Sequence, residues 1–251
     1  MPGNIFIGTS GWNYAHWSNG QFYPRSCRQR EWLAFYARHF STVEINNSFY
    51  RLPAPETFAA WSRQVPRDFV FAVKGSRFIT HMKKLKDPES SVELFLSHSS
   101  RLRKKLGPIL FQLPPQMPAN ALRLEEFISA FRRRKRLRIA LEFRHGSWFN
   151  EQIYEIVHKA GWTVCLADWQ NLPRDAPVLG SFCYIRRHGA TARYAGSYSD
   201  EQLARDAEFA MNVVKQERDV YIYFNNDAQA HAIKNASTLI GLIDPGYLHR
   251  L

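Results

Sequence analysis

The sequence predicts a single (β/α)8 TIM barrel, an α/β fold, that spans residues 1–251. The chain has 251 residues, close to the roughly 250 that such a barrel usually needs. Short apolar runs rich in β-branched and aromatic residues recur along its whole length. Segments whose apolar residues have helical spacing separate these runs, and this alternation is typical of repeated βα units.

Eight apolar runs are expected to be strands. They cover residues 5–8, 42–45, 69–73, 109–113, 137–141, 163–167, 182–185 and 220–224. Helices are expected at residues 29–39, 56–64, 89–106, 122–134, 150–160, 200–216 and 228–242. Pro55 suits a first helical turn, while Gly107 and Gly161 follow helical segments, where a left-handed residue often ends a helix. Eight such units favour a closed barrel over an open, doubly wound sheet.

The charge balance favours anionic partners. The chain has 34 Lys and Arg against 22 Asp and Glu, a formal net charge of +12, which attracts phosphate esters, nucleic acid or acidic surfaces. The three cysteines form no CxxC pair, which fits a reducing compartment. The N-terminus lacks the pattern of a signal peptide, and no apolar stretch is long enough to cross a membrane. We therefore expect a cytoplasmic protein without a membrane partner.

Polar residues follow nearly every predicted strand at its carboxyl end. Because the carboxyl ends of barrel strands open on one face, we expect these residues to form one concave ligand site. The catalytic candidates are Glu44, Lys74, His81, Glu142 and His188. The substrate-binding candidates are Asn46, Asn47, Tyr50, Gln112, Arg144, Asp168, Arg186, Tyr223, Asn225 and Asp227.

Several chemistries fit this set of residues. Glu44 and Glu142 are candidate acids or bases, or the carboxylate pair of a glycosidase. Lys74 is also a candidate Schiff-base amine, and the histidines suit proton transfer near neutral pH. We prefer a reading in which the cations Lys74, Arg144 and Arg186 clamp a phosphate or carboxylate; the alternative is that they neutralise the carboxylates within the protein.

The sequence does not decide whether the protein binds a divalent metal as a cofactor. Carboxylates together with a histidine such as His81, His145 or His188 would suffice for a divalent metal, with Asn46, Asn225 and Asp227 as supporting residues. Arg144, two residues after Glu142, favours neutralisation of the carboxylates by cations of the protein over their use as metal ligands. Neither a P-loop nor a GxGxxG motif after a strand is present.

Five segments at the strand ends resemble the hallmarks of the YecE-like family, also called DUF72. They are residues 8–12 (GTSGW), 44–51 (EINNSFYR), 112–115 (QLPP), 142–145 (EFRH) and 223–227 (YFNND). The match runs in order from the first strand to the last and so covers nearly the whole chain. The resemblance implies a TIM barrel of an uncharacterised group, which has been likened to sugar isomerases and to barrels of the endonuclease IV type.

The functional hypothesis is an enzyme at the strand ends that acts on a small anionic or polyhydroxylated, sugar- or phosphate-like substrate. Sugar-isomerase chemistry and phosphodiesterase or other hydrolase chemistry both remain open. The alternative is a protein that binds nucleic acid or a phosphate-bearing ligand without turnover, through the basic runs 101–105 and 132–136. Both runs are expected to be helical and to lie away from the strand-end site, so the two hypotheses use different surfaces.

Overall fold

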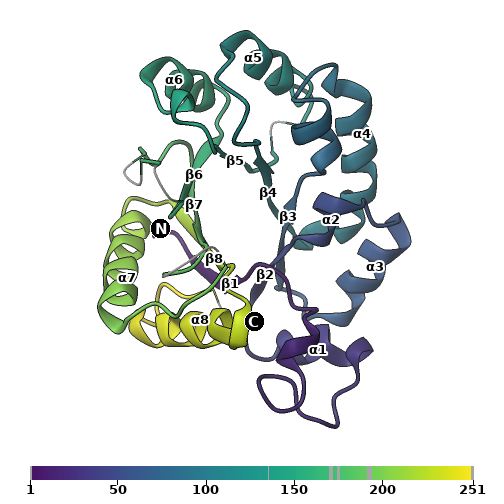
Figure 1. The fold of residues 1–251 in the computed structure, drawn as a ribbon, viewed down its shortest axis with the longest axis vertical. Helices are drawn as coiled ribbons and strands as arrows, with labels where there is room; N and C mark the ends of the chain where they lie inside the picture. The colour runs from purple at the N-terminus through teal and green to yellow at the C-terminus, as the bar shows by residue number, and fades with distance from the viewer. Residues whose placement is uncertain (1, 135, 170–171, 174–175, 191–193, 250–251) are drawn as a thin grey trace. The chain divides into compact units, whose positions relative to one another are not determined.

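The computed structural model describes residues 2–134, 136–169, 172–173, 176–190 and 194–249. Eight strands form one sheet in the order β1-β8-β7-β6-β5-β4-β3-β2, and helices alternate with them along the chain. An isolated parallel bridge between Ser10 and Glu44 links the two strands at the ends of that order. This is the TIM barrel that the sequence predicts (Figure 1).

All eight predicted strands are present; β2 and β6 have the predicted bounds, and no end of the others is shifted by more than three residues. Their bounds are β1 Ile5–Thr9, β2 Thr42–Ile45, β3 Val70–Lys74, β4 Leu106–Gln112, β5 Ile139–Glu142, β6 Thr163–Ala167, β7 Phe182–Arg187 and β8 Asp219–Phe224. The α-helices are α1 Trp32–Tyr36, α2 Asn47–Tyr50, α3 Pro55–Gln64, α4 Pro88–Ser99, α5 Ala121–Ser129, α6 Glu151–Lys159, α7 Asp200–Val214 and α8 His231–Leu242. Shorter helical turns are η1 Ala15–Trp17, η2 Gln29–Glu31, η3 Phe78–Met82, η4 Ser100–Lys105, η5 Gly146–Trp148 and η6 Ala228–Ala230.

Two expected helix ends are wrong. α4 ends at Ser99 and the chain continues as η4, with Arg103 in the left-handed region at φ 57°. Gly107 lies inside β4, because Leu106 already pairs with Phe71 of β3 as strand, so Gly107 does not end a helix. Gly161, with φ of 70°, follows α6 as expected.

The second basic run is not helical, contrary to expectation. α5 ends at Ser129, and Arg132–Arg134 lie in a turn after it, while Lys135 lies outside the described residues. The turn forms because Phe131 folds back into the core, where its ring lies 5.2 Å from that of Trp162. The first basic run does fall in a helical turn, η4.

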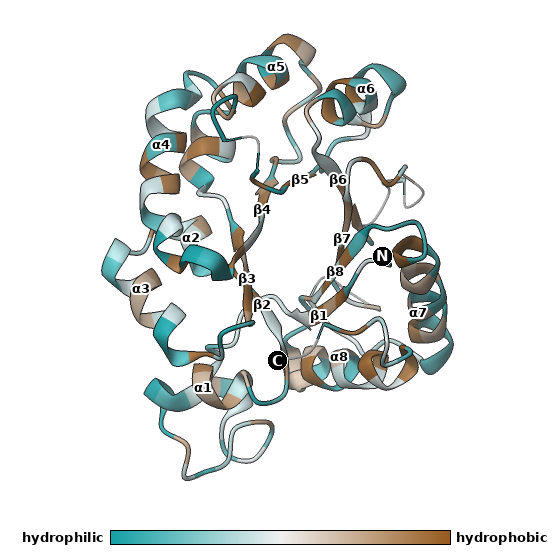
Figure 2. Ribbon diagram, turned by 180° about the vertical axis from the view of Figure 1, so that it is seen from behind, coloured by the Kyte–Doolittle hydropathy of each residue, from teal (hydrophilic) through white to brown (hydrophobic). Residues whose placement is uncertain are grey.

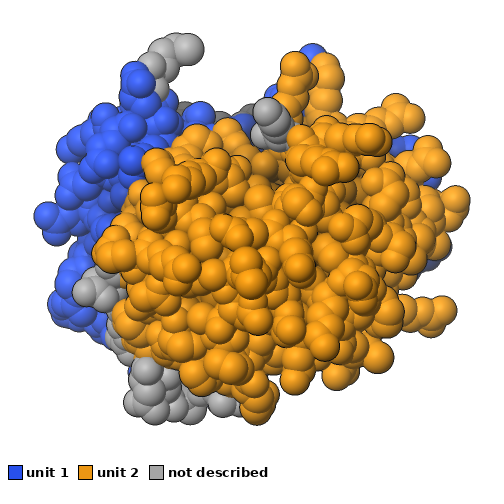
Figure 3. Space-filling view, turned by 90° about the horizontal axis from the view of Figure 1, so that it is seen from above, with its two compact units in different colours: residues 1–44, 63–70, 185–251 blue, residues 45–62, 71–184 orange. Residues whose placement is uncertain are grey.

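The chain divides into two compact units, which Figure 3 colours blue and orange. Unit 1 comprises residues 1–44, 63–70 and 185–251, and unit 2 comprises residues 45–62 and 71–184. The single domain expected from the sequence stays a prediction. None of the described helices is long and apolar enough to cross a membrane.

In unit 1, β1 and β8 pair in parallel register from Ile5 opposite Val220 to Thr9 opposite Phe224. α7 and α8 lie beside these two strands (Figure 1). Gly8 allows a close approach to the next strand, because a Cβ at this position would lie 2.2 Å from the carbonyl oxygen of Thr42.

Tyr36 joins β1 to β2 within unit 1. Its hydroxyl donates to the carbonyl oxygen of Thr42 at 3.1 Å and accepts from the amide of Thr9 at 2.9 Å. Burial raises the pKa of Tyr36, so this hydroxyl stays protonated and keeps its donor role at neutral pH. A side chain from α1 thereby joins the end of β1 to the start of β2.

In unit 2, β3, β4, β5 and β6 pair in parallel, and α4, α5 and α6 follow them in turn. The strands are mainly in hydrophobic colours and the helices in mixed ones (Figure 2), as expected for a sheet covered by amphipathic helices. Phe111 of β4 lies 5.0 Å from the Phe127 ring of α5, and this aromatic packing is fully buried.

Candidate functional site

Polar side chains meet at the carboxyl ends of β3, β4 and β5 in unit 2. Lys74 is the last residue of β3 and pairs in register with Leu110, while Gln112 and Glu142 end β4 and β5 and lie opposite each other. Side chains two residues apart on a strand point to the same side of the sheet. Gln112 therefore points the same way as Leu110, the residue that pairs with Lys74. The three strands are parallel; β4 and β5 end opposite each other, and β3 ends two residues earlier, from where the Lys74 side chain reaches Gln112.

Lys74 and Arg144 are the two buried cations of this cluster. Lys74 Nζ donates to Gln112 Oε1 at 2.8 Å and lies 4.1 Å from the centre of the Phe49 ring. Arg144 forms an ion pair with Glu142 and stacks over Trp169. A cation over an aromatic face in a desolvated place gains about 2 kcal/mol, which offsets part of the cost of burying it.

His81 stands beside these cations. It lies in η3, its ring 5.0 Å from that of Phe49 in an edge-to-face contact, and its Nδ1 shares a hydrogen bond of 2.9 Å with the Thr80 hydroxyl. Burial, with the nearby cations Lys74, Arg77 and Arg144, lowers the pKa of His81 to about 4. His81 is therefore neutral at pH 7 and lies in a positive potential.

The remaining candidates of unit 2 are more exposed. Asn47 and Tyr50 belong to the short helix α2, where Tyr50 is 73% exposed, and Asn46 is partly buried just before that helix. Asp168 is partly buried directly after β6 and next to Trp169.

A second polar cluster lies in unit 1. Arg186 of β7 donates to Glu44 of β2 at 2.7 Å, both fully buried, and approaches the Ser10 hydroxyl at 3.4 Å. His188 and Asn225, which follow β7 and β8, share a hydrogen bond of 3.2 Å and are also buried. The structure thus brings Glu44 together with Arg186, and His188 together with Asn225.

Tyr223 and Asp227 make other contacts within unit 1. The Tyr223 hydroxyl lies 2.7 Å from Thr42 Oγ1 at the start of β2, and burial keeps the pKa of this phenol well above its usual value. Asp227 forms an ion pair of 3.4 Å with His16, and its main-chain oxygen accepts from Trp17 Nε1 at 2.9 Å. Burial raises the pKa of Asp227, an effect that His16 partly opposes.

Phe49 and Ser10 were not among the expected site residues. Phe49 is the aromatic contact of both Lys74 and His81, and Ser10 lies beside Arg186. Both stand inside the motif segments 44–51 and 8–12, so the signal was their position next to a strand end. Their apolar or small side chains gave no chemical reason to single them out.

The carboxylates of both clusters are paired with arginines. Glu142 pairs with Arg144, and Glu44 pairs with Arg186. In the part of the chain that the structure describes, no group of three or more His, Cys, Asp or Glu is arranged to hold a metal ion. Neutralisation of carboxylates by cations, the alternative to an anion clamp in the sequence analysis, is thus present at both places.

Comparisons with known proteins agree with this architecture. The model of a family described as "Protein of unknown function DUF72" matches residues 6–248. The UPF0759 protein YunF of Bacillus subtilis strain 168 is 26% identical over 275 residues, which cover 97% of this chain and 96% of YunF. The UPF0759 protein YecE of Escherichia coli K12 is 34% identical over 110 residues, 44% of this chain and 38% of YecE. A DUF72 family protein from Thermotoga maritima has a similar structure, with a TM-score of 0.86 and 27% identity over 95% of this chain and 98% of that one.

Proposed function

The chain belongs to the DUF72 family, and from this premise we propose that the carboxyl ends of β3 to β6 bind a small anionic, polyhydroxylated substrate, on which the protein acts as an isomerase or hydrolase. TIM-barrel enzymes place their chemistry at the carboxyl ends of the strands, and the cluster of unit 2 lies there. The observation that carries the proposal is the pair of buried cations, Lys74 at the end of β3 and Arg144 just after β5, the two strands on either side of β4.

The electrostatics of the cluster favour an anion. Two buried cations, Lys74 and Arg144, stand against one buried carboxylate, Glu142, and Arg77 adds to the positive potential at His81. A phosphate or carboxylate placed among these groups would accept charge-assisted hydrogen bonds, which are about twice as strong as neutral ones. The cluster therefore suits the anionic end of a substrate.

The neighbouring groups suit hydroxyls and the apolar face of a sugar. The Gln112 amide can donate to hydroxyl groups, and the partly exposed Asp168 carboxylate can accept from them. Trp169 and Tyr50 supply aromatic surface of the kind that packs against sugar C–H groups. A sugar phosphate or a sugar acid combines the two requirements.

His81 and Glu142 are the proposed proton carriers. In an isomerase, one of them would take a proton from the carbon beside a carbonyl and return it to the neighbouring carbon. Lys74 and Arg144 would stabilise the negative oxygen that forms meanwhile. In a hydrolase the same base would take the proton of an attacking water and then give it to the oxygen of the leaving alcohol as the scissile bond breaks. The neutral state of His81 at pH 7 fits a base in either reaction.

Nuclear magnetic resonance of His81 tests the binding step. We expect inorganic phosphate, and more strongly fructose 6-phosphate, to raise the pKa of His81 in a saturable way, because an added anion cancels the positive potential. The assignment comes from the resonance that is missing in His81→Gln. Lys74→Met and Arg144→Gln should weaken the effect, whereas Arg101→Gln, on exposed η4, serves as the matched control. A pKa of His81 that stays unchanged at saturating phosphate would disprove anion binding here.

Turnover is a separate measurement. Fructose 6-phosphate, other sugar phosphates and bis(p-nitrophenyl) phosphate can be assayed with the parent protein and with Glu142→Gln. Loss of activity in Glu142→Gln at unchanged phosphate binding supports the role of Glu142 in proton transfer. Phosphate binding without turnover on any of them would favour a binding protein over an enzyme.

The second candidate function is nucleic-acid binding, favoured by the net charge of +12. Its residues would be the basic side chains of η4, such as Arg101 and Lys104, which are exposed. Affinity for an oligonucleotide would then fall steeply with salt, because phosphate neutralisation releases counterions. It would also fall in Arg101→Gln/Lys104→Gln and persist in Arg144→Gln, and the opposite pattern would refute this candidate.

A further inference from the structure

Large apolar side chains are exposed together on two elements of unit 2, α2 and η3. Eight such side chains are exposed in the described part of the chain, and three of them, Tyr50, Phe78 and Met82, belong to these two elements. The other five lie one each on α4, α5, α7 and α8 and in the segment at Tyr194. Single exposed apolar side chains are normal on a protein surface, whereas a group of them beside a polar site is typical of ligand or partner binding.

Phe49 connects these exposed side chains with the cations of the candidate site. Its ring lies 5.1 Å from the ring of Tyr50 and 5.0 Å from that of His81, edge to face in both contacts. Lys74 Nζ lies 4.1 Å from the centre of the same ring. Phe49 itself is buried, so Tyr50 presents the accessible aromatic surface, one ring away from Lys74 and His81.

η3 carries the other two exposed apolar side chains together with His81. It forms a π-helical turn, in which the Lys83 amide donates to the Phe78 carbonyl oxygen at 2.9 Å. Phe78 and Met82 are almost one such turn apart, so they lie on the same side of η3. Met82 is 65% exposed and directly follows His81 in the chain. η3 thus places an exposed thioether next to a proposed proton carrier, and single π-helical turns are frequent at functional sites.

The backbone after η3 is held in an unusual conformation. Lys84, Leu85 and Asp87 have positive φ angles of 49°, 66° and 39°. Such residues keep this conformation only where the surrounding structure enforces it. Here Leu85 is buried and its amide donates to the Ile79 carbonyl oxygen at 3.0 Å, while Lys83 Nζ donates to that of Asp87 at 2.5 Å. The fold therefore fixes the position of η3 before any ligand binds.

The surface of α2 and η3 is positively charged. The chain from residue 71 to residue 86 contains no acidic residue, and Arg77, Lys84 and Lys86 of this stretch are exposed. Arg77 also contributes to the positive potential that lowers the pKa of His81. An aromatic group that is attached to an anion is attracted to such a surface, whereas a neutral aromatic molecule gains nothing from the charge.

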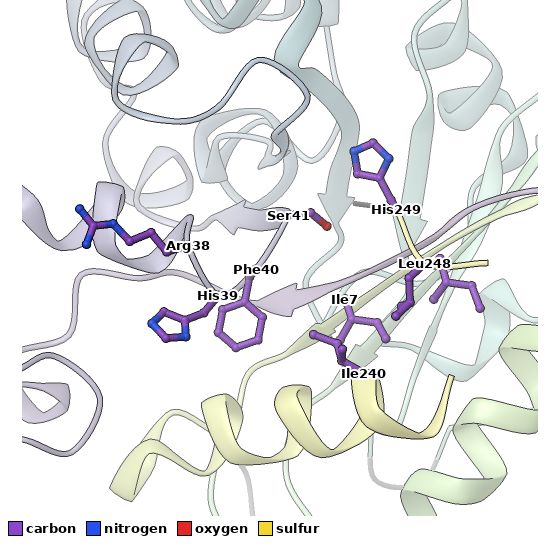
Figure 4. Close-up of a pocket in the computed structure, with 9 residues that line it drawn as sticks. Ile7, Arg38, His39, Phe40, Ser41, Ile240, Leu248 and His249 are labelled. Carbon is purple, nitrogen blue, oxygen red and sulfur yellow. The ribbon is translucent and has the colours of Figure 1, made fainter. Parts of the chain in front are cut away.

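The cavity of about 310 Å³ in unit 1 lacks this combination. In Figure 4 the Arg38 side chain extends away from Ser41 and from the apolar lining residues Ile7, Ile240 and Leu248. The described lining therefore directs no guanidinium toward its apolar wall. The apolar surface of α2 and η3, by contrast, is joined to a buried cation through the Phe49 ring.

We propose that the substrate of the β3 to β6 site carries an aromatic group next to its anionic end, and that Tyr50 and Met82 bind this group. The inference rests on the proposed function, because Lys74 and Arg144 hold the anion and Trp169 packs against the sugar. The aromatic group lies against the Tyr50 ring and the Met82 thioether, since sulfur makes favourable contacts with aromatic rings. The substrate class is thereby narrowed from a sugar phosphate or sugar acid to one with an aryl substituent.

Calorimetric titration with simple phosphate esters measures the contribution of the aromatic group. At pH 8 phenyl phosphate and methyl phosphate carry the same charge, because the second pKa of a phosphate monoester is about 6. We expect phenyl phosphate to bind at least about tenfold more tightly, the effect of burying one face of a ring. Cyclohexyl phosphate, which lacks the aromatic contacts, should bind about threefold more weakly than phenyl phosphate.

Variants of exposed residues locate the aromatic group. Tyr50→Ser and Met82→Ser should each reduce the preference for phenyl over methyl phosphate about threefold, and the double variant should abolish it. Tyr50→Phe keeps the ring and should keep the preference. The matched controls are Leu94→Ser on α4 and Leu122→Ser on α5, which remove apolar side chains that are 56% and 73% exposed and should leave the preference unchanged. Thermal unfolding verifies that each variant is folded.

Each opposing outcome has one meaning. Equal affinity of the parent protein for phenyl and methyl phosphate would overturn the aromatic group and leave anion binding, and with it the proposed function, intact. Equal affinity for phenyl and cyclohexyl phosphate would likewise overturn it. A preference that Tyr50→Ser/Met82→Ser retains, or that Leu94→Ser loses, would refute the assignment to α2 and η3. Binding of neither ester would refute the proposed function and this inference together.

Discussion

The guanidinium carbon of Arg144 lies 3.4 Å from the centre of the Trp169 ring, while the same guanidinium pairs with Glu142. A planar guanidinium can stack on a ring with its face and bind a carboxylate with its edge at the same time. An ammonium group cannot make both contacts in this way. The arrangement therefore depends on arginine, beyond its positive charge.

Arg144→Met should lower the free energy of unfolding by about 3 to 5 kcal/mol, because it leaves Glu142 buried without its counter-charge. The double variant Glu142→Gln/Arg144→Met should recover part of this loss, since it removes both charges. Urea unfolding of the parent, the two single variants and the double variant measures the coupling. Additive losses would contradict a direct interaction.

Glu44→Gln should lower the free energy of unfolding by about 3 kcal/mol, because Arg186 then faces a neutral amide in the core. The exposed pair of Lys159 and Glu155 on α6 is the matched comparison. Lys159→Gln should leave the urea midpoint unchanged, since exposed ion pairs contribute little. Equal effects of the two substitutions would show that burial does not govern the Glu44 pair.

His81 should make the protein less stable as the pH falls. In the unfolded chain the imidazole takes up a proton near pH 6.5, but in the folded protein it does so only near pH 4. Protonation in this window therefore favours the unfolded state, and the stability that neutral His81 contributes is complete above pH 6.5.

The test compares urea unfolding at pH 7 and pH 5 for the parent and His81→Gln. The parent should lose about 1 kcal/mol more than the variant, a value discounted for the partial exposure of the ring. Identical losses would mean that the pKa of His81 is not lowered in the folded protein.

Tyr223→Phe should lower the free energy of unfolding by about 1 kcal/mol, because the buried hydrogen bond to Thr42 is lost while the Thr42 hydroxyl keeps its bond to the Val70 carbonyl oxygen. Tyr50→Phe is the control, since Tyr50 is 73% exposed and water replaces its hydrogen bonds. Thermal or urea unfolding compares the two. A neutral Tyr223→Phe would mean that the hydroxyl contact adds nothing to stability.

The strands could be predicted well because their signal is local. Runs such as 42–45 and 163–167 are short and contain β-branched residues, and both have the predicted bounds. The helix ends were harder, because they depend on tertiary contacts. Leu106 belongs to a strand through its pairing with Phe71, and Phe131 turns inward toward Trp162, neither of which the spacing of residues shows.

The candidate site was predictable in its positions and less so in its contacts. The rule that parallel strands open on one face placed Lys74, Gln112 and Glu142 near one another. The register sets Gln112 opposite Glu142, and a hydrogen bond joins Lys74 to Gln112. The choice of Arg144 as the partner of Glu142 was one of several open pairings. Phe49 escaped notice because a phenylalanine in a motif has no chemistry of its own until its ring is seen beneath a cation.

The closeness of Gly8 to Thr42 sets a limit on how this protein can be altered. Even alanine at position 8 would place a methyl group 2.2 Å from a main-chain oxygen, so the two strands would have to separate. Asn47 and Tyr50, by contrast, are exposed and can be randomised at little cost to folding. A mutant library intended to change substrate preference should therefore vary α2 and keep position 8 fixed.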